Sequence, residues 1–217
     1  MAVSLNPNGL TLGNETKGDW ADVGGGTVSK VFTSSGNVTK GSAGDIHIMA
    51  AGGGSGGVRQ GGSNPDGANG ASSFGRFTIK NVPAGSTVAV NVGSGGAGKL
   101  TNNAQNPGNP GAGNASQVSI SGHATVRING AGISTNWNQY NDNKNAASGG
   151  NVSVNSGSSN VVVYGNQGGN GAFYGNYGSA NGVPNEDLTP YGDGGKANGS
   201  NAAENNGGNG IVIIYGI

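Results

Sequence analysis

The sequence contains no cysteine, so disulfide bonds and thiolate metal sites are excluded. Charge is also scarce: only 9% of the 217 residues are charged, and ten basic residues balance ten acidic ones. No basic patch stands out to attract nucleic acid. No apolar run approaches the roughly 18 residues of a membrane-spanning helix, and the N-terminus lacks the regions of a signal peptide. We therefore expect no nucleic-acid partner, no membrane insertion, no metal and no cofactor.

Proline (7 residues) and hydrophobic residues (32%) are few, whereas glycine is abundant, with 48 copies. The glycine spacing is irregular, which excludes a collagen triple helix. Disordered chains usually carry high charge or much Pro and Glu; this chain carries β-branched runs instead, so we expect it to be ordered. Because ordering glycine costs much backbone entropy, the thin core needs help. Hydrogen-bonded rows of glycine backbone, or apolar faces buried between copies, would supply it.

Short β-branched runs bounded by Gly, Asn, Ser or Pro predict strands and essentially no helix. The predicted strands are 30–33, 45–49, 76–80, 86–92, 117–121, 124–129, 151–155, 161–164 and 210–215. Residues 76–80 and 87–92 alternate with period two, so one face is buried. Residues 211–215 do not alternate, which indicates a strand buried on both faces or pressed between chains.

Five of the apolar runs border glycine tracts, at 52–57, 93–98, 130–132, 165–171 and 205–210. This layout is typical of a β scaffold that presents close-packed glycine backbone and long polar loops. The predicted fold class is all-β: a glycine-rich β-sandwich or jelly-roll-like fold with long polar loops and polyglycine-II segments. Residues 1–30 are interpreted as an N-terminal attachment segment, with an irregular first strand as the alternative, and 31–217 as the glycine-rich β domain.

Four long polar segments separate the strands, at about 58–73, 99–115, 133–150 and 166–209. Loops longer than about 12–15 residues are usually functional or disordered. The last two contain aromatic residues among Asn, Ser and Gly, a composition typical of binding loops. The candidate binding residues are Trp137, Tyr140, Phe173, Tyr174, Tyr177 and Tyr191. For each of them, covering the thin core is the alternative role.

A nucleotide site is not predicted. Residues 93–99 match the phosphate-loop pattern G-x-x-x-x-G-K, but Leu100 stands where the Mg²⁺-binding Ser or Thr is needed. The residues that follow are too rich in Asn, Pro and Gly for the helix whose N-terminus would face the phosphate. With so much glycine, a chance match to this pattern is expected.

A catalytic or metal site is equally weakly indicated. His47 and His123 are far apart and lack metal or triad spacing, and His47 should lie on the opposite strand face from its isoleucine neighbours. Glu186, Asp187 and Asp193 form an acidic group near aromatic residues, which could in principle cleave a glycan. Because adjacent acids usually point in different directions, we expect no enzyme.

Several motifs resemble those of the glycine-rich domains of bacteriophage tail-fibre proteins. Residues 31–39 (VFTSSGNVT) followed by 45–54 (DIHIMAAGGG) are similar to the opening of these domains. Residues 71–75 (ASSFG), 90–98 (VNVGSGGAG) and 208–215 (GNGIVIIY) are similar to their later motifs, in the same order. The match covers roughly residues 31–217, although this chain lacks the long N-terminal domain of T-even-type tip adhesins and its tracts are shorter and richer in Asn.

The resemblance implies a receptor-binding fibre tip with variable loops between glycine motifs. We expect non-covalent binding of a host surface glycan or outer-membrane protein, with aromatic stacking and hydrogen bonds from Asn and Ser. The expected partners are copies of the chain in a homotrimer, a longer fibre protein, or both. A chain that starts at Met1 suggests a separately encoded tip or short fibre subunit, made in the host cytoplasm and released by lysis within the virion.

Three other functions stay open at this point. A purely structural fibre or capsid-decoration protein would bind no receptor. An ice-binding protein would need regular repeats, and the sequence has no fixed period. A glycan depolymerase would release oligosaccharide.

Overall fold

Two five-stranded antiparallel sheets face each other and enclose the main core. The structure is a computed structural model that describes residues 5–6, 9–10, 30–60, 67–68, 70–101, 109–133, 147–165, 168, 173–174, 188, 190–195 and 205–217. One sheet, the β9 sheet, has the order β13 (Val152–Ser156), β12 (Ala124–Ile128), β11 (Ser116–Ile120), β9 (Thr87–Asn91) and β4 (Gly36–Thr39). The other, the β5 sheet, has the order β14 (Val161–Gly165), β8 (Gly75–Val82), β5 (Gly44–Ala51), β16 (Ile211–Tyr215) and β3 (Lys30–Phe32). The all-β prediction is confirmed, and the described helical residues are limited to the 3-10 turn η1 (Ser158–Asn160) and Asn205.

The main core follows from the period-two pattern of the strands. In β9, for example, Val88 and Val90 are buried while their neighbours are exposed. The inward residues of β5 and β8 meet those of β9, β11 and β12, and Ile46, Ile48 and Phe77 are fully buried. Burying each such side chain contributes roughly 1.5–3 kcal/mol. The two sheets are therefore joined by a compact layer of valine, isoleucine and phenylalanine.

Strand β16 is buried on both faces, as the non-alternating sequence predicts. It lies between β5 and β3, and all five of its residues are buried. Val212 and Ile214 point into the main core. Ile211, Ile213 and Tyr215 belong to a second, smaller cluster with Met49, Ala51 and Leu188 on the outer side of the β5 sheet. A segment near residue 190 covers this face of the sheet.

All nine predicted strands are present, and the structure adds short ones that the sequence analysis did not predict. Besides β4, these are β1 (Leu5–Asn6), β2 (Gly9–Leu10), β6 (Val58–Gln60), β7 (Gly67–Ala68), β10 (Lys99–Thr101) and β15 (Phe173–Tyr174). Strands β1 and β2 form a small hairpin. The last four form a separate sheet with the order β10-β6-β7-β15.

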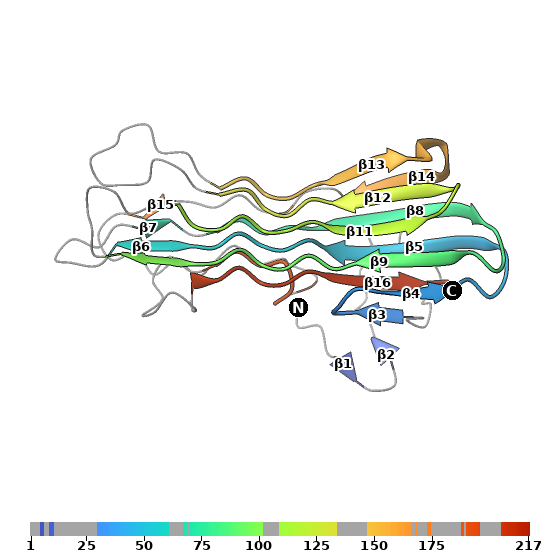
Figure 1. Cartoon of the computed structure of the whole chain (residues 1–217), viewed down its shortest axis with the longest axis horizontal. Helices are drawn as coiled ribbons and strands as arrows, with labels where there is room; N and C mark the ends of the chain where they lie inside the picture. Colours follow the sequence, from blue (N-terminus) through green and yellow to red (C-terminus); the bar gives the residue numbers. More distant parts are fainter. Residues whose placement is uncertain are drawn as a thin grey trace.

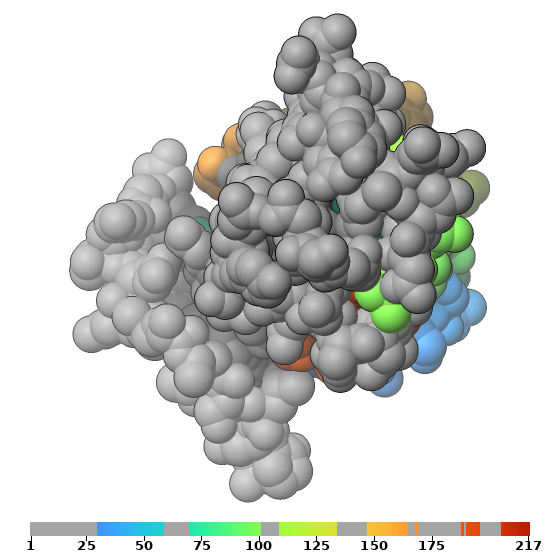
Figure 2. All heavy atoms as spheres, turned by 90° about the vertical axis from the view of Figure 1, so that its left-hand side faces the viewer, coloured from blue at the N-terminus to red at the C-terminus, as the bar shows by residue number. Residues whose placement is uncertain are grey.

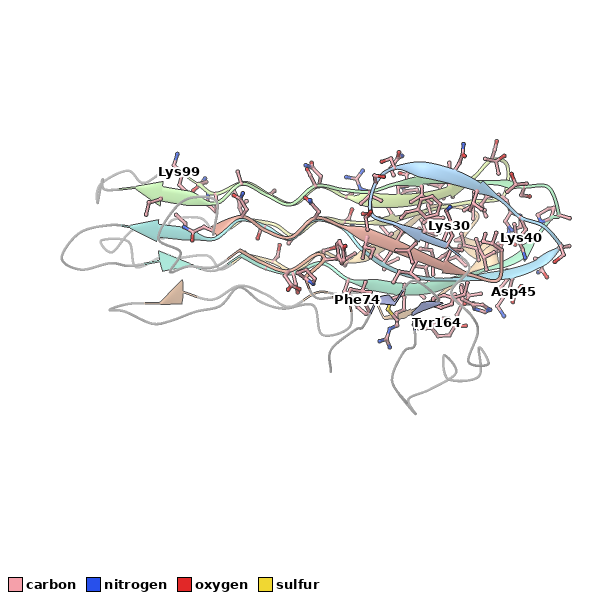
Figure 3. The ribbon with its side chains drawn as sticks, turned by 90° about the horizontal axis from the view of Figure 1, so that it is seen from below. Lys30, Lys40, Asp45, Phe74, Lys99 and Tyr164 are labelled. Carbon is pink, nitrogen blue, oxygen red and sulfur yellow. The ribbon has the colours of Figure 1, made fainter. Side chains whose placement is uncertain are left out.

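The molecule is elongated, with the sandwich at one end and the four-stranded sheet at the other (Figure 1). Between them the chain passes back and forth as glycine tracts that lie side by side. Side chains crowd the sandwich and are sparse along the tracts, and Lys99 stands at the far end from Lys40 (Figure 3). The functional question therefore concerns the glycine region and the end that it supports.

Candidate functional site

The glycine tracts form one bundle around residues 52–57. Each amide of this central tract donates to a neighbouring tract, and the neighbour changes with a repeat of three residues. The bonds run from Gly53 to the carbonyl of Asn114 (2.7 Å), Gly54 to Gly208 (2.9 Å), Ser55 to Ala71 (3.0 Å), Gly56 to Gly111 (2.9 Å) and Gly57 to Asn205 (2.7 Å). Residues three apart thus share a neighbour.

The carbonyl groups of the central tract accept from three further tracts. The amide of Ala131 donates to the carbonyl of Gly53, and that of Gly96 to the carbonyl of Gly54. The amide of Gly195 donates to the carbonyl of Ser55, and that of Lys99 to the carbonyl of Gly57. The tract at 52–57 is therefore surrounded by six others. We call this arrangement the glycine bundle, made of residues 52–57, 70–73, 93–98, 109–115, 129–132, 147–150, 192–195 and 205–210.

A repeat of three is what an extended threefold helix without internal hydrogen bonds produces. A β-strand has a repeat of two and pairs with two neighbours, so it could not bond to six. The hydrogen-bond pattern favours the polyglycine-II segments expected from the sequence, whose backbone conformation stays a prediction. The pattern also explains how backbone alone can hold together a region with so few side chains.

Glycine is required inside this bundle because the backbones touch. A Cβ added to Gly53, Gly54 or Gly56 would lie 1.9, 1.8 or 2.1 Å from a neighbouring carbonyl oxygen. Real Cβ atoms essentially never approach another atom within 3.0 Å. Any larger residue would force the tracts apart and break the hydrogen bonds between them.

The bundle holds small buried side chains, among them Ser55, Ala71 and Ala131, and in two tracts the exposed residues also carry side chains. In the tract at 93–98, Gly93 and Gly96 are buried, whereas Ser94 and Ala97, three residues apart, are exposed. In the tract at 205–210 the exposed residues are asparagines, again three apart. Their Oδ1 atoms accept from the amides of the neighbouring tract: Asn206 from Gly98 (2.6 Å) and Asn209 from Gly95 (3.0 Å). Asparagine thus replaces a missing backbone neighbour at the rim of the bundle.

Buried serines join the sandwich to the bundle. The Ser116 Oγ accepts from the amide of Gly93 (3.0 Å) and donates to the carbonyl of Ala51 (2.7 Å). The Ser73 Oγ accepts from the amide of Gly52 (3.0 Å) and donates to the carbonyl of Asn129 (2.6 Å). These hydroxyls satisfy backbone groups at the point where the period-two ladder changes to the period-three bundle.

Glycine tracts carry the chain from the sandwich toward the other end of the molecule and back (Figure 1). Strands β5, β9, β12 and β14 run into tracts that lead away from the sandwich, and β8, β11, β13 and β16 begin where tracts return. The tracts are connected by residues 58–69, 99–108, 134–146 and 196–204, and residues 166–187 connect β14 to Leu188 on the outer side of the β5 sheet. Strands β6, β7, β10 and β15 belong to three of these connecting segments and pair with one another in one sheet. We call the end of the molecule where this sheet lies the loop-bearing end (Figure 1). Figure 2 looks along the molecule onto this end.

The structure places the predicted binding residues differently from one another. Trp137, Tyr140 and Tyr177 lie outside the described residues. Phe173 and Tyr174 form β15 at the loop-bearing end, where their backbone pairs with that of Ala68 and Gly67.

Tyr191 lies elsewhere, at the border between the sandwich and the bundle. It is half-buried against the cluster that contains Met49 and Ile213, and its amide donates to the carbonyl of Leu188 (2.8 Å). This packing matches the core-covering alternative, and a role of Tyr191 in binding stays a prediction.

Charge is distributed unevenly between the scaffold and these segments. The described residues include seven basic side chains but only two acidic ones, Asp45 and Asp193. The connecting segments carry Asp66, Asp142, Glu186, Asp187 and Glu204 against Arg59, Lys99, Lys144 and Lys196. The connecting segments are therefore nearly balanced in charge, whereas the described residues outside them have five basic side chains against two acidic ones.

The histidines have structural positions. His47 lies on the outer side of β5, and its Nδ1 hydrogen-bonds to the Thr78 hydroxyl (2.8 Å). Burial lowers the pKa of His47, Asp45 raises it and Lys80 lowers it further. His123 lies in the β11–β12 turn with its Nε2 2.8 Å from the carbonyl oxygen of Lys80.

Two findings concern the metal site and the nucleotide site that the sequence does not predict. Within the described ranges, no group of three His, Asp or Glu residues could hold a metal ion. The phosphate-loop match at 93–99 runs directly into strand β10 (Lys99–Thr101) and not into a helix. The glycines of that match are instead packed in the bundle.

Fold and site together define a class: an all-β protein in which a glycine bundle lies between a β-sandwich and a small four-stranded sheet. No protein-family model matches this chain, and no curated protein matches it. In the part of the chain that the structure describes, no helix is long and apolar enough to cross a membrane.

Proposed function

We propose that this chain is a tail-fibre tip protein of a bacteriophage virion, which binds a host cell-surface receptor non-covalently. The binding surface is formed by the segments at the loop-bearing end. The receptor is a surface glycan or an outer-membrane protein. The chain is held on the virion as a homotrimer, by a longer fibre protein, or by both.

The observation that carries this proposal is the return of the chain to one end through a backbone-bonded bundle. Most hydrogen bonds between tracts join main-chain groups, so the sequence of the connecting segments can vary without changing the bundle. A rigid scaffold that presents variable loops is the usual arrangement in binding proteins. The motif resemblance described above supports the same function.

The composition of the segments supports recognition rather than chemistry. Trp137, Tyr140, Phe173, Tyr174 and Tyr177 lie in them, and aromatic side chains supply rigid contact area at low entropic cost. Asn and Ser supply hydrogen bonds. Binding by such groups needs no catalytic constellation.

Competition with the phage tests the proposal. Purified protein should block phage adsorption to host cells, whereas a purely structural virion protein should not. Trp137→Ala or Tyr174→Ala should abolish blocking while leaving the thermal melt nearly unchanged. Thr39→Ala, an exposed change on the β9 sheet, is the matched control and should block like the wild type.

Two outcomes would contradict the assignment. A collapsed melt with unchanged adsorption would show that these aromatics serve the fold. Release of soluble oligosaccharide from host surface polysaccharide would indicate a depolymerase in place of an adhesin.

A further inference from the structure

One edge of the sandwich is apolar and exposed. Strand β14 ends the β5 sheet and β13 ends the β9 sheet, and both lie along the upper edge of the sandwich in Figure 1. Val162, Val163 and Tyr164 of β14 are 36%, 38% and 40% exposed. Among the described residues only one other large hydrophobic side chain, Leu100 at the loop-bearing end, is comparably exposed.

The inner side of this edge is apolar too. Val152 of β13 and Val161 of β14 are only partly buried, and both pack against the main core. Neither strand contains a charged residue. On their outward sides, neither β13 nor β14 has a strand partner among the described residues.

The opposite edge of the β5 sheet, formed by β3, is protected against pairing with another strand. There Phe32 of β3 is buried and covers the end of the core. The ammonium group of Lys30 stands 5.9 Å from the Phe32 ring centroid. A lysine on an edge strand discourages pairing with another strand. At the β14 edge the described residues show a register shift between Val163 and Gly165 in the pairing with β8, an irregularity that disturbs the strand beyond Val163.

We propose that the β13–β14 edge is an interface between copies of this chain. A sheet edge binds an extended strand through main-chain hydrogen bonds, and adjacent side chains set which strand is accepted. Valine opposite valine is a favourable cross-strand pair. Two copies of this edge can meet about a two-fold axis, each contributing the same surface.

Charge favours a second copy over a foreign partner. The edge offers no charged group that could select an oppositely charged protein, and the whole chain has zero net charge, so two copies do not repel each other strongly. The nearest exposed basic side chains, Lys80 and Arg127, lie one strand further in, on β8 and β12. Salt should screen their repulsion across the interface and tighten pairing. An acidic foreign strand would be bound less tightly as salt is added.

The solution mass of the purified chain tests this inference, which does not depend on the proposed function. Light scattering or sedimentation over a wide concentration range should show twice the chain mass of 20.9 kDa. Val162→Lys and Val163→Lys should each weaken pairing at least about tenfold, because two like charges would meet in the interface. Leu100→Lys changes an equally exposed residue outside the edge and should pair like the wild type. Thermal melts show which variants remain folded.

The absence of cysteine gives a second readout. Single cysteines at positions 161, 162 and 163 should yield a covalent dimer on oxidation at one or more positions, and Leu100→Cys should not. A monomer at every concentration would overturn the inference. So would a mass of three chains that neither lysine substitution changes, which would support the homotrimer expected from the sequence.

Discussion

The positions of glycine and asparagine in the tracts depend on how closely each residue packs against neighbouring backbone. In the tracts at 93–98 and 206–210, every exposed residue carries a side chain and every glycine is buried or half-buried. The motif x-Gly-Gly-x therefore records a threefold repeat, with Ser94 and Ala97 in one tract and Asn206 and Asn209 in another. The side-chain oxygens of these two asparagines accept hydrogen bonds from backbone amides at the rim of the bundle. The unusual composition is thus a consequence of the bundle.

Gly54→Ala tests the requirement for glycine. The added Cβ would lie 1.8 Å from the carbonyl oxygen of Asp193, and the nearest atoms are all backbone. We expect a loss of about 3 kcal/mol or more in the free energy of unfolding, measured by urea denaturation. Gly41→Ala is the control, because nothing lies within 4 Å of its added Cβ. It should change stability by less than about 0.5 kcal/mol, and equal effects of the two changes would contradict this account.

Ser116→Ala tests the junction between the sandwich and the bundle. The change leaves the buried amide of Gly93 and the carbonyl of Ala51 without their hydroxyl partner. Leaving such groups unsatisfied costs about 1–3 kcal/mol. Ser121→Ala, at an exposed turn position, should be nearly neutral. Thermal melting of both variants measures the difference, and a neutral Ser116→Ala would mean that water or backbone movement replaces the hydroxyl.

At the scale of elements, the strands of the sandwich could be predicted and the short strands could not. Val88 and Val90 alternate with polar residues, and the run at 211–215 is apolar throughout, so sequence alone indicates both the strands and their burial. Strand β4 contains one apolar residue, Val38, and β7 is Gly67–Ala68. Such strands form because a neighbour offers a free edge, and this information is tertiary.

The candidate site was predictable in part. Long polar segments beside glycine tracts indicated where the chain leaves the scaffold, and Phe173–Tyr174 lies at the loop-bearing end. The pairing of β6, β7, β10 and β15 at one end could not be read from the sequence, because it depends on which tracts hydrogen-bond to one another. The period-three signal was present in the spacing of Asn206 and Asn209. Tyr191 is predicted as a binding residue from its loop composition, but it is half-buried against the second cluster, a contact that the sequence does not reveal.

Strand β16 gives a prediction for alkaline pH. Burial raises the pKa of Tyr215 from its ordinary 10.0 to about 12, although Arg76 acts in the opposite direction. The unfolded chain therefore loses this proton at lower pH than the folded chain. The stabilisation is fully present below pH 10 and is lost as pH rises from 10 to about 12.

Tyr215→Phe should reduce this alkaline loss by about 2–3 kcal/mol relative to the wild type, because a shift of one pKa unit corresponds to 1.36 kcal/mol. Urea denaturation at several pH values between 9 and 12 measures the difference. The other five tyrosines are present in both proteins, so the comparison isolates Tyr215. Parallel stability curves for the two proteins would contradict the raised pKa.

At the scale of the whole molecule, the sandwich and the bundle are built from the same passes of the chain. Strand β16 at the C-terminal end pairs with β3 and β5 from the N-terminal half. The central tract likewise bonds to tracts near residues 71, 111 and 205. Contacts between distant segments are slow to form. Because the sandwich and the bundle share these passes, we expect the two regions to open together.

Hydrogen exchange tests this coupling between the two regions. The central tract at 52–57 has no hydrogen bonds within itself, and its amides are held by tracts distant in sequence. Opening it requires separation from neighbours that continue into both sheets, so its amides should exchange only through global unfolding. We expect the amide of Gly54 to be protected as strongly as that of Ile213 in β16, and Gly54→Ala to reduce the protection of both. A bundle that exchanges freely while β16 stays protected would show that the sandwich folds alone and that the glycine region is a loosely held extension, unsuited to fixing the positions of binding segments.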